Sequence, residues 1–400
     1  MNEDLSAYLE DLSKCVRCGK CKAVCPTLDK EYVEPMGARG RIMLLMALMS
    51  GRVEPSPLLN DRIFSCILCG ACTSACPLGV DVGEAMYRGR ELLCRTDRGR
   101  KHLRSAVKFV LRRPELTFRL LHMGRRVLLE RLVKKGAVPF LPDLPRSALE
   151  REEQVFKVPR KKGRVAVFTG CSVNYLFPSL AGSLIQVLQR LGYEVVLPKG
   201  EVCCGAPLRA MGLGEEAARM ARKNLEVFGR LNAEAVLSLC PTCTDTIRNG
   251  YRKFIGAGLE NAADISAFFS GKLSVMESIG KTSIFHDPCH LQYGLGIRRE
   301  PRDIIRKAGI GLIETGESGC CGFGGTFCFS HKDLSAGLLE KRTGEIVGSG
   351  ADVVVTSCPG CILQLSRTIK DRPILHLIEV IEEAYCLREM EEGVLTSVRG

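Results

Sequence analysis

The chain has no tryptophan, and its aromatic residues make up only 6% of 400 positions. Proteins that hold single-stranded nucleic acid stack bases on such rings, so a nucleic-acid partner is not expected. Long hydrophobic runs are also missing, since the longest near the start, residues 42–49, is far shorter than the roughly 20 residues of a membrane span. We therefore expect no transmembrane segment, and any membrane contact would be peripheral or through a partner.

The N-terminal stretch MNEDLSAYLEDLSK lacks the apolar core of a secretory signal peptide. We expect a cytoplasmic protein, with a peripheral position on the inner face of the cytoplasmic membrane as an option. Cytoplasmic thiols stay reduced. The 21 cysteines are then metal ligands or redox groups rather than disulfide partners.

Most of the net charge of +12 lies in one segment. Residues 100–135 contain 12 lysines and arginines but only two glutamates, Glu115 and Glu130, which leaves a local charge of +10. Apolar residues recur at helical spacing on both sides of Pro114, which predicts two amphipathic helices. The segment is either a solvated helical linker or a surface that docks to an acidic partner or an anionic membrane.

Two cysteine runs near the N-terminus share the spacing C-x2-C-x2-C-x3-C-P, which is typical of ferredoxins with two [4Fe-4S] clusters. In such runs the fourth cysteine ligates the other cluster. The predicted ligand sets are Cys15, Cys18, Cys21 and Cys76 for one cubane and Cys66, Cys69, Cys72 and Cys25 for the other. Zinc sites also use C-x2-C, but they explain neither the third evenly spaced cysteine nor the proline after the fourth.

The rest of the chain contains one cysteine pattern twice. Each copy has a single cysteine, an adjacent pair followed by glycine, and a C-P-x-C element, with intervals of 32 and 36 residues in the first copy and 31 and 37 in the second. This regularity indicates an internal repeat. Neighbouring cysteines bridge each other only with strain, so each pair is expected to face another group.

The sequence around these cysteines predicts α/β units. In both copies a buried strand precedes the single cysteine, the pair and the C-P-x-C element, and helices follow the first and last of these. The five cysteines of a repeat would then lie at the carboxyl ends of neighbouring parallel strands, where open α/β sheets build their sites. A cluster with extra or bridging thiolates accounts for all five. Thioredoxin-like dithiols at the C-P-x-C elements are the alternative, although they leave three cysteines per repeat unexplained.

At these cysteines the chain resembles, over nearly its whole length, the CCG-domain iron–sulfur proteins. These include iron–sulfur subunits of glycolate oxidase, D-lactate dehydrogenase and anaerobic glycerol-3-phosphate dehydrogenase, and catalytic subunits of heterodisulfide reductases. The resemblance implies one or two non-cubane [4Fe-4S] clusters in addition to the two cubanes. Its implied ligands are Cys171, Cys203, Cys204, Cys240 and Cys243 in the first repeat and Cys289, Cys320, Cys321, Cys358 and Cys361 in the second.

The resemblance implies two functions. One is an electron-transfer subunit of a flavin-dependent glycolate or D-lactate dehydrogenase or oxidase, with an FAD-containing partner subunit and a quinone, membrane subunit or other acceptor. The stretches EPMGARGRIMLLMALMSG, GCSVNY and CCGFGGTF look like this class. The alternative is a heterodisulfide-reductase-type subunit that reduces a disulfide at its CCG clusters, which the two intact C-P-x-C elements favour. We prefer the dehydrogenase partner and assign no catalytic residue.

We expect four regions. They are a helical two-cluster ferredoxin domain (1–98), a basic helical linker (99–160) and two pseudo-repeated CCG α/β domains (161–275 and 276–400). His286, Asp287 and His290 flank Cys289 and are expected to have structural roles, with hydrogen bonds to cluster sulfurs as the alternative. Cys94, Cys328 and Cys386 fall outside every motif and are expected to be buried, inert thiols. No flavin or nicotinamide motif stands out, so we expect electrons to arrive from another polypeptide.

Overall fold

The computed structural model describes residues 12–124, 130–134, 136, 138–140, 142–149, 152–275, 280–314 and 319–384. The chain forms two compact units, which are described separately. Unit 1 contains Met1–Leu141, Gly205–Met220 and Gly319–Arg342, and unit 2 contains Pro142–Cys204, Ala221–Ser318 and Thr343–Gly400. The four regions expected from the sequence stay predictions.

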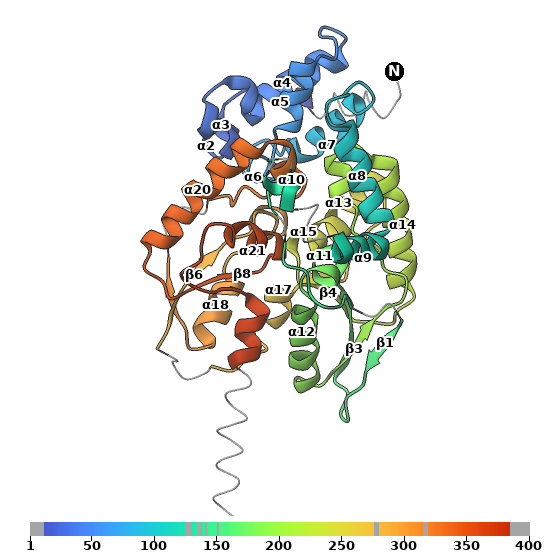
Figure 1. Ribbon diagram of the computed structural model, residues 1–400, viewed down its shortest axis with the longest axis vertical. Helices are drawn as coiled ribbons and strands as arrows, with labels where there is room; N and C mark the ends of the chain where they lie inside the picture. The colour runs from blue at the N-terminus through green and yellow to red at the C-terminus, as the bar shows by residue number, and fades with distance from the viewer. Residues whose placement is uncertain are drawn as a thin grey trace, which may run out of the picture. The chain divides into compact units, whose positions relative to one another are not determined.

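Unit 1 is helical (Figure 1). Its first part consists of α2 (Lys20–Ala23), α3 (Pro26–Glu31), η1 (Glu34–Met36), α4 (Ala38–Met49), α5 (Pro57–Phe64), α6 (Ala71–Ser74) and α7 (Val82–Leu93). Ser56 caps α5 by accepting from the Leu59 N–H, and Asp81 caps α7 by accepting from the Glu84 N–H. The apolar sides of α4, α5 and α7 form one buried core that also borders several cysteines of the two N-terminal runs. Helix packing therefore positions both runs.

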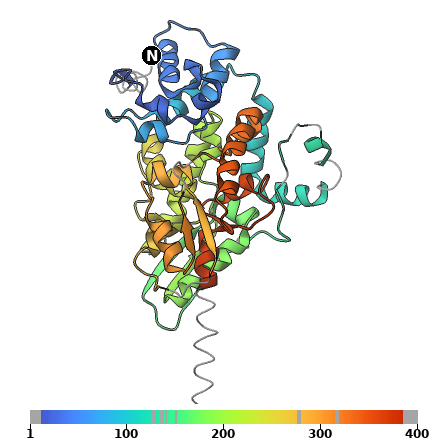
Figure 2. The same ribbon diagram turned by 90° about the vertical axis from the view of Figure 1, so that its left-hand side faces the viewer.

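Two helices follow in the basic segment, α8 (Lys101–Arg112) and α9 (Pro114–Gly124), and a short α10 (Glu130–Lys134) comes after them. The prediction of helices on both sides of Pro114 is thus confirmed, because a proline is compatible with the first turn of α9 but not with the interior of one continuous helix. Figure 2 shows α9 and α10 standing apart from the helices around the cysteine runs. In the described part of the chain, no helix has both the length and the apolar character of a membrane span.

Unit 1 also includes the chain that follows each cysteine pair. The first such segment contains α13 (Ala206–Ala210) and the start of α14 (Gly214–Gly229), and the second contains α19 (Phe327–Ser330) and most of α20 (Lys332–Gly348). The first is joined to α7 by a buried ion pair in which Arg209 donates to both carboxylate oxygens of Glu84 at 2.6 and 3.1 Å.

The second segment packs on the cysteine runs. Leu334 and Leu338 of α20 share a buried apolar cluster with Met36 and Ile67. Each segment therefore has its own attachment to the N-terminal helices, one ionic and one apolar.

Unit 2 contains two mainly parallel sheets. The first has the order β1-β3-β2-β4-β5 and the second β7-β6-β8-β9. The strands of the first sheet are β1 (Gln154–Phe156), β2 (Gly163–Phe168), β3 (Tyr193–Leu197), β4 (Ala235–Ser238) and β5 (Ala262–Asp264). Those of the second are β6 (Thr282–His286), β7 (Gly311–Ile313), β8 (Val353–Thr356) and β9 (Ile374–His376). Strand β1 pairs antiparallel with β3, and every other pair is parallel. This confirms the expected α/β class.

Helices and π-helical turns cover the sheets of unit 2. They are α11 (Gly170–Tyr175), α12 (Pro178–Arg190), α15 (Pro241–Asp245), η3 (Thr246–Gly250), α16 (Tyr251–Ile255), α17 (Ile265–Phe269), η4 (His290–Gly294), α18 (Glu300–Lys307) and α21 (Pro359–Leu365). One apolar core extends through both sheets, with Val165 and Leu237 from the first and Phe285 and Val355 from the second. The two repeats therefore fold as parts of one body.

His376, at the end of β9, joins the two repeats inside this body. Its side chain is fully buried, and its Nε2 donates to the carbonyl of Leu239, which follows β4 of the other sheet, at 2.9 Å. Its Nδ1 accepts from the Ile378 N–H at 3.2 Å, so the neutral tautomer protonated at Nε2 satisfies both contacts. Burial lowers the pKa of His376 to about 4.

This buried imidazole predicts a pH-dependent stability. Its pKa is 6.5 when solvated, so between that value and about pH 4 the unfolded chain binds a proton that the folded chain does not. Stability should fall by up to about 3 kcal/mol as the pH drops through this window. We expect His376→Gln, which can still donate to Leu239 but does not titrate, to lose less over the same window. Denaturant unfolding of both proteins between pH 7 and 4.5 measures the difference, and parallel profiles would contradict the prediction.

Candidate functional site

The N-terminal cysteine runs line two separate cavities in unit 1. One cavity is bordered by Cys15, Cys18, Cys21 and Cys76 and the other by Cys25, Cys66, Cys69 and Cys72. The two cavities have the same volume, about 20 Å³ each, so they can hold groups of the same size. In each case the fourth cysteine of one run lies with the first three of the other. This is the grouping that the spacing predicts.

The backbone of both runs follows the same unusual path. Arg17 and Leu68, each just before the second cysteine of its run, have positive φ values of 58° and 61°. Gly19 and Gly70, just after it, have values of 87° and 80°. A left-handed conformation is unfavourable for arginine and leucine, and such strain persists where the surroundings require it. Two runs that curl identically around a cavity lined by four thiols suit a [4Fe-4S] cubane, which each set of four cysteines would hold.

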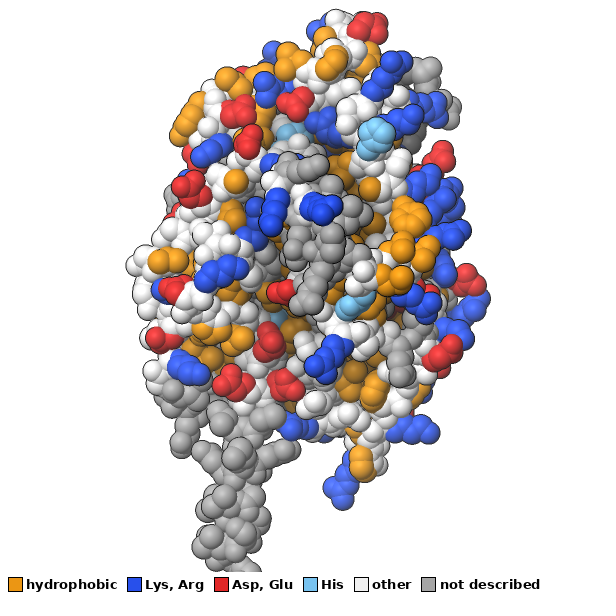
Figure 3. Space-filling view, viewed as in Figure 1, with side chains coloured by type: hydrophobic (Ala, Val, Ile, Leu, Met, Phe, Trp, Pro, Cys, Tyr) orange, Lys and Arg blue, Asp and Glu red, His pale blue; other side chains and the backbone are white. Residues whose placement is uncertain are grey.

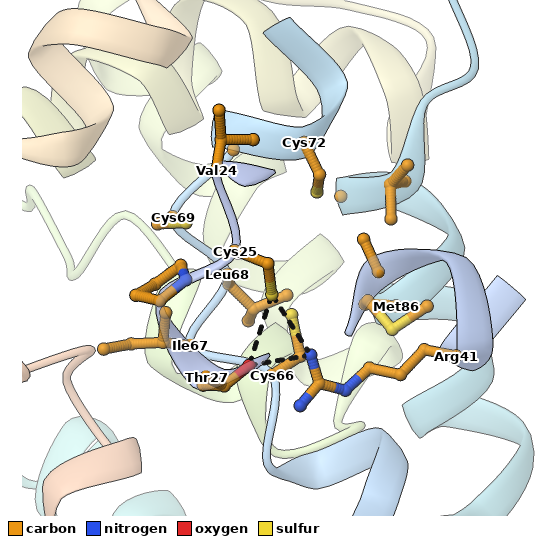
Figure 4. A pocket seen from close by; sticks show the side chains of 15 residues that line it. Val24, Cys25, Thr27, Arg41, Cys66, Ile67, Leu68, Cys69, Cys72 and Met86 are labelled. Atoms are coloured by element: carbon orange, nitrogen blue, oxygen red, sulfur yellow. Dashed lines mark hydrogen bonds between the residues drawn. The ribbon is translucent and has the colours of Figure 1, made fainter. Parts of the chain in front are cut away.

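Figure 4 shows the cavity of Cys25, Cys66, Cys69 and Cys72 from close by. The guanidinium of Arg41 points toward Cys25 and Thr27 from helix α4, and Thr27 Oγ1 lies 3.4 Å from Cys25 Sγ. Burial raises the pKa of the Cys72 thiol, as it does that of Cys21 in the other cavity. These thiols are protonated without metal, so cluster binding has to displace their protons.

The first CCG repeat brings its cysteines together inside unit 2. Cys171 begins α11 after β2, Cys203 and Cys204 follow β3, and Cys240 and Cys243 lie at the start of α15 after β4. Cys203 Sγ lies 3.8 Å from Cys171 Sγ, and Cys204 is within hydrogen-bond reach of both Cys203 and Cys243. All five therefore meet at the carboxyl edge of one parallel sheet, and all except the half-buried Cys171 are buried.

The pKa values of these thiols reflect their crowding. Hydrogen bonds with Cys171 and Cys204, together with burial, raise the pKa of Cys203 well above its usual value. A hydrogen bond with Cys243 lowers the pKa of Cys240, but contact with Cys358 and burial outweigh it and raise that pKa to about 12. Thiols in such surroundings are weak nucleophiles unless a metal replaces their protons. This argues against a thioredoxin-like dithiol at Cys240 and Cys243.

Glycine is required next to the first cysteine of this repeat. Gly170 has a φ of 59°, and a Cβ at this position would lie 3.2 Å from the sulfur of Cys243. Gly170 therefore lets the backbone before Cys171 pass close to the sulfur of Cys243. The five cysteines of this repeat thus suit a cluster with more than four thiolate ligands.

Two polar residues that the sequence analysis did not select frame these cysteines. Glu201 is partly buried, lies two residues before Cys203 and accepts from the N–H groups of Thr169 and Gly170 at the start of α11. Burial raises the pKa of Glu201 to about 7. Asn224 of α14 accepts from the Val202 N–H at 3.0 Å and donates to the Cys203 carbonyl at 3.2 Å. Closeness to the cysteine pair along the chain could have suggested Glu201, whereas no sequence signal points to Asn224, 20 residues after Cys204.

The cysteines of the second repeat are divided between the two units. Cys289, Cys358 and Cys361 belong to unit 2, where Cys358 contacts Cys240 of the first repeat. Cys320 and Cys321 belong to unit 1, where Cys320 packs beside Cys69 on the apolar cluster of Met36 and Ile67. The five-cysteine set of this repeat therefore stays a prediction.

The remaining candidates differ in their surroundings. Asp287 accepts from two guanidinium nitrogens of Arg302 at 2.8 and 2.7 Å, and His290 Nδ1 lies 3.2 Å from Thr242 Oγ1. His286 is fully buried, and one of its ring nitrogens lies within 4.8 Å of the sulfur of Cys361 in the same unit. Among the cysteines outside the motifs, Cys328 is fully buried and Cys94 half-buried, while Cys386 lies outside the described residues.

Known protein families match both parts of the chain. Residues 11–80 match the 4Fe-4S dicluster domain. Residues 165–248 and 283–366 each match the cysteine-rich domain CCG. A solved structure described as a hypothetical protein from Helicobacter pylori is similar in fold, with a TM-score of 0.52 and 10% identity over 96% of this chain and 73% of that one.

Relatives of similar identity come from different oxidoreductases. A chain of the fumarate reductase (CoM/CoB) of Methanothermobacter marburgensis is 26% identical over 94% of this chain and 72% of its own length. The probable glycolate oxidase iron–sulfur subunit of Bacillus subtilis is 27% identical over 94% of both chains. A chain of the dihydromethanophenazine:CoB–CoM heterodisulfide reductase of Methanosarcina barkeri is 26% identical over 95% of both.

These matches agree with the geometry of the site. Two cavities lined by four cysteines each lie in the region of the dicluster domain, and the repeated cysteine patterns fall in the two cysteine-rich domains. The chain is an iron–sulfur oxidoreductase subunit of the CCG-domain family.

Proposed function

We propose that this chain is the electron-transfer subunit of a complex in which a separate FAD-containing subunit oxidises a 2-hydroxyacid such as glycolate or D-lactate. Electrons would leave to a quinone or another acceptor. The observation that carries the proposal is the pair of four-cysteine cavities, accompanied by a third group of five cysteines in the first CCG repeat. When bound, [4Fe-4S] clusters supply one-electron transfer.

The residues of the chain support such a relay by holding sulfur ligands close to one another. In unit 1, Cys69 and Cys320 border the same apolar cluster. A Cβ on Gly324 would lie 2.5 Å from the Ile67 side chain, so the loop after the second cysteine pair approaches the second cysteine run closely. Close, dry packing between ligand-bearing loops shortens the distance that an electron has to cross.

The 2-hydroxyacid substrate rests on similarity. The glycolate oxidase protein of Bacillus subtilis matches over nearly the whole of both chains, and that of Escherichia coli is 27% identical over 93% of this chain. The stretch EPMGARGRIMLLMALMSG, which looks like the glycolate oxidase type, forms η1 and α4 and contributes Arg41 to one of the cavities.

Reduction of a disulfide at the CCG cysteines is the second candidate function. The contact between Cys240 and Cys358 favours it, because it brings the C-P-x-C elements of the two repeats together in unit 2. A site with thiolates from both repeats could hold two clusters near one substrate disulfide. The similarity to the heterodisulfide reductase of Methanosarcina barkeri supports the same candidate.

Cluster content tests the part that both functions share. Wild-type protein purified without oxygen should contain two cubanes and at least one further cluster. We expect Cys204→Ser and Cys321→Ser to remove signals of the further clusters while both cubanes remain, because neither residue lines a cubane cavity. Iron counting and electron paramagnetic resonance measure this.

Cys328→Ser is the matched control, since Cys328 is buried but lies outside every motif. It should keep the complete iron content. Wild-type protein with only two clusters and a reducible dithiol at Cys240 and Cys243 would contradict the five-thiolate site.

The choice between the two functions is tested by the electron donor. Our proposal predicts that the clusters are reduced when glycolate or D-lactate is added to the complex purified with its flavoprotein, which absorbance bleaching follows. Pre-reduced protein alone should not cleave a thiol-derived disulfide at a comparable rate. Fast disulfide cleavage without bleaching by either hydroxyacid would support the second candidate instead.

We also propose that the end of α8 and the start of α9 dock the chain to an acidic partner subunit. The beginning of the basic segment is held within unit 1, because Arg104 pairs with Asp97 at 2.7 Å and Lys108 pairs with Glu216. Arg112 and Arg113 are exposed, although Arg112 also lies 3.9 Å from Glu216, and half of Leu120 is accessible. Figure 3 shows Lys and Arg side chains beside apolar ones over this part of the molecule. Arg125 and Arg126, also expected to take part, lie outside the described residues.

Charge reversal tests the docking surface. We expect Arg112→Glu with Arg113→Glu to weaken co-purification of the partner at least tenfold and to remove its salt sensitivity. Lys199→Glu with Arg230→Glu, an equal change of charge at exposed positions of unit 2, should have little effect. Flotation with anionic vesicles distinguishes binding to a lipid surface from binding to a protein partner. If the charge reversal changes neither co-purification nor flotation, the segment is only a solvated linker.

A further inference from the structure

Two buried guanidinium groups adjoin one cubane cavity and not the other. The side chain of Arg41 in α4 lines the cavity of Cys25, Cys66, Cys69 and Cys72, and Arg90 of α7 contacts the backbone of Cys66. Arg41 is 1% exposed and Arg90 is 3% exposed. Within the described residues, neither of them forms an ion pair with a carboxylate. Uncompensated buried charges are rare in proteins and call for an explanation.

Arg41 is held firmly against the cavity (Figure 4). Its Nη1 lies 4.0 Å from the sulfur of Cys25 and donates to Thr27 Oγ1 at 3.0 Å. Its Nη2 donates to Ser65 Oγ at 2.9 Å, and its Nε donates to the Arg62 carbonyl at 2.8 Å. All of these acceptors are neutral or sulfur, so they fix the position of the charge without cancelling it.

Arg90 lies on the other side of Cys66. It donates to the carbonyls of Phe64 at 3.1 Å, Ala210 at 2.8 Å and Cys66, and its guanidinium stacks 5.2 Å from the centre of the Phe64 ring. Burial lowers the pKa of Arg90 to about 10, so it stays protonated at neutral pH. Two permanent positive charges thus adjoin the same set of cysteines.

The cavity of Cys15, Cys18, Cys21 and Cys76 has a different electrostatic environment. Its lining includes Arg17, Lys20 and Arg39. Arg17 and Lys20 are exposed, and Arg39 is 30% exposed and pairs with Glu34 at 2.7 Å. Lys22 pairs with the same carboxylate at 2.8 Å, and more than a third of each side chain in that pair is exposed. Water and Glu34 therefore screen the positive charge near this cavity.

We propose that Arg41 and Arg90 raise the reduction potential of the cluster held by Cys25, Cys66, Cys69 and Cys72 above that of the other cubane. Taking up one electron adds a negative charge to the site, and a fixed positive charge a few ångströms away in a dry interior stabilises it. Net charge and hydrogen bonds near the cluster sulfurs are known determinants of such potentials. The inference rests on the ligand sets proposed above.

The gradient gives the two cubanes different roles. Cys69, a ligand of the higher-potential set, packs on the same apolar cluster as Cys320 of the second CCG motif. The arginines would thus hold the electron next to the cysteine pair that follows it in the relay. The buried arginines of this chain, rather than a partner subunit, would set the direction in which electrons flow between the cubanes.

A redox titration followed by electron paramagnetic resonance tests the proposal on the full chain, with soluble mediators as electron donors. The Cys18→Ser variant identifies the signal of the first set, because Cys18 lines only that cavity. The other cubane signal then belongs to the second set. We expect it to have the higher midpoint potential in wild-type protein. Arg41→Met should lower that midpoint and leave the other unchanged, and Arg41→Lys should retain most of the wild-type value.

Arg39→Met is the matched control, since it removes a screened arginine from the other cavity, and we expect both midpoints to stay close to wild type. If Arg41→Met loses iron, the order of the two midpoint potentials in wild-type protein and the midpoint potential of Arg41→Lys test the proposal instead. Unchanged midpoints in an iron-replete Arg41→Met protein, or a higher midpoint for the first set in wild type, would overturn this proposal alone. Absence of either cubane signal from wild type would overturn the ligand sets as well.

Discussion

The crowding of cysteine sulfurs in the protein interior is the constraint on which the rest of the structure depends. Thiols packed against one another, such as Cys203 and Cys243, have pKa values well above the usual value, so they cannot be separate thiolates without a metal. The strands, helix starts and glycines around them hold the sulfur atoms close together. Packing alone adds little stability to such an arrangement. Metal binding supplies the missing stabilisation, as it does in other small metal-dependent domains.

Much of this arrangement could be predicted from the sequence. Spacing alone identified the grouping of Cys76 with Cys15, Cys18 and Cys21, because a three-residue gap cannot place the fourth sulfur of a run in the same corner as the first three. The strands before Cys171 and Cys240 were also predictable, since short apolar runs followed by C-P or G-C end at the edge of a parallel sheet.

Other features could not be predicted, for reasons that are physical. Arg41 and Arg90 look like surface residues, since arginine is normally exposed, and only the packing of α4, α5 and α7 shows that they are buried. The antiparallel edge strand β1 lies in a region that was expected to be a helical linker, and three residues are too few for a periodic signal. The division of the second repeat between two units depends on tertiary contacts of α20 that no local pattern contains.

The composition of unit 1 has a consequence for how the protein is made. A ribosome that has added the first hundred residues has produced all eight cubane ligands, yet the partners of Glu84 and Met36 in α13 and α20 are still untranslated. The nascent N-terminal region therefore leaves the Glu84 carboxylate unpaired with Arg209 until more than 100 further residues have emerged, and its apolar surface uncovered by Leu334 until more than 200 have. Cluster assembly factors and chaperones would meet an open form of this region, and its final closure would wait until α20 has been made.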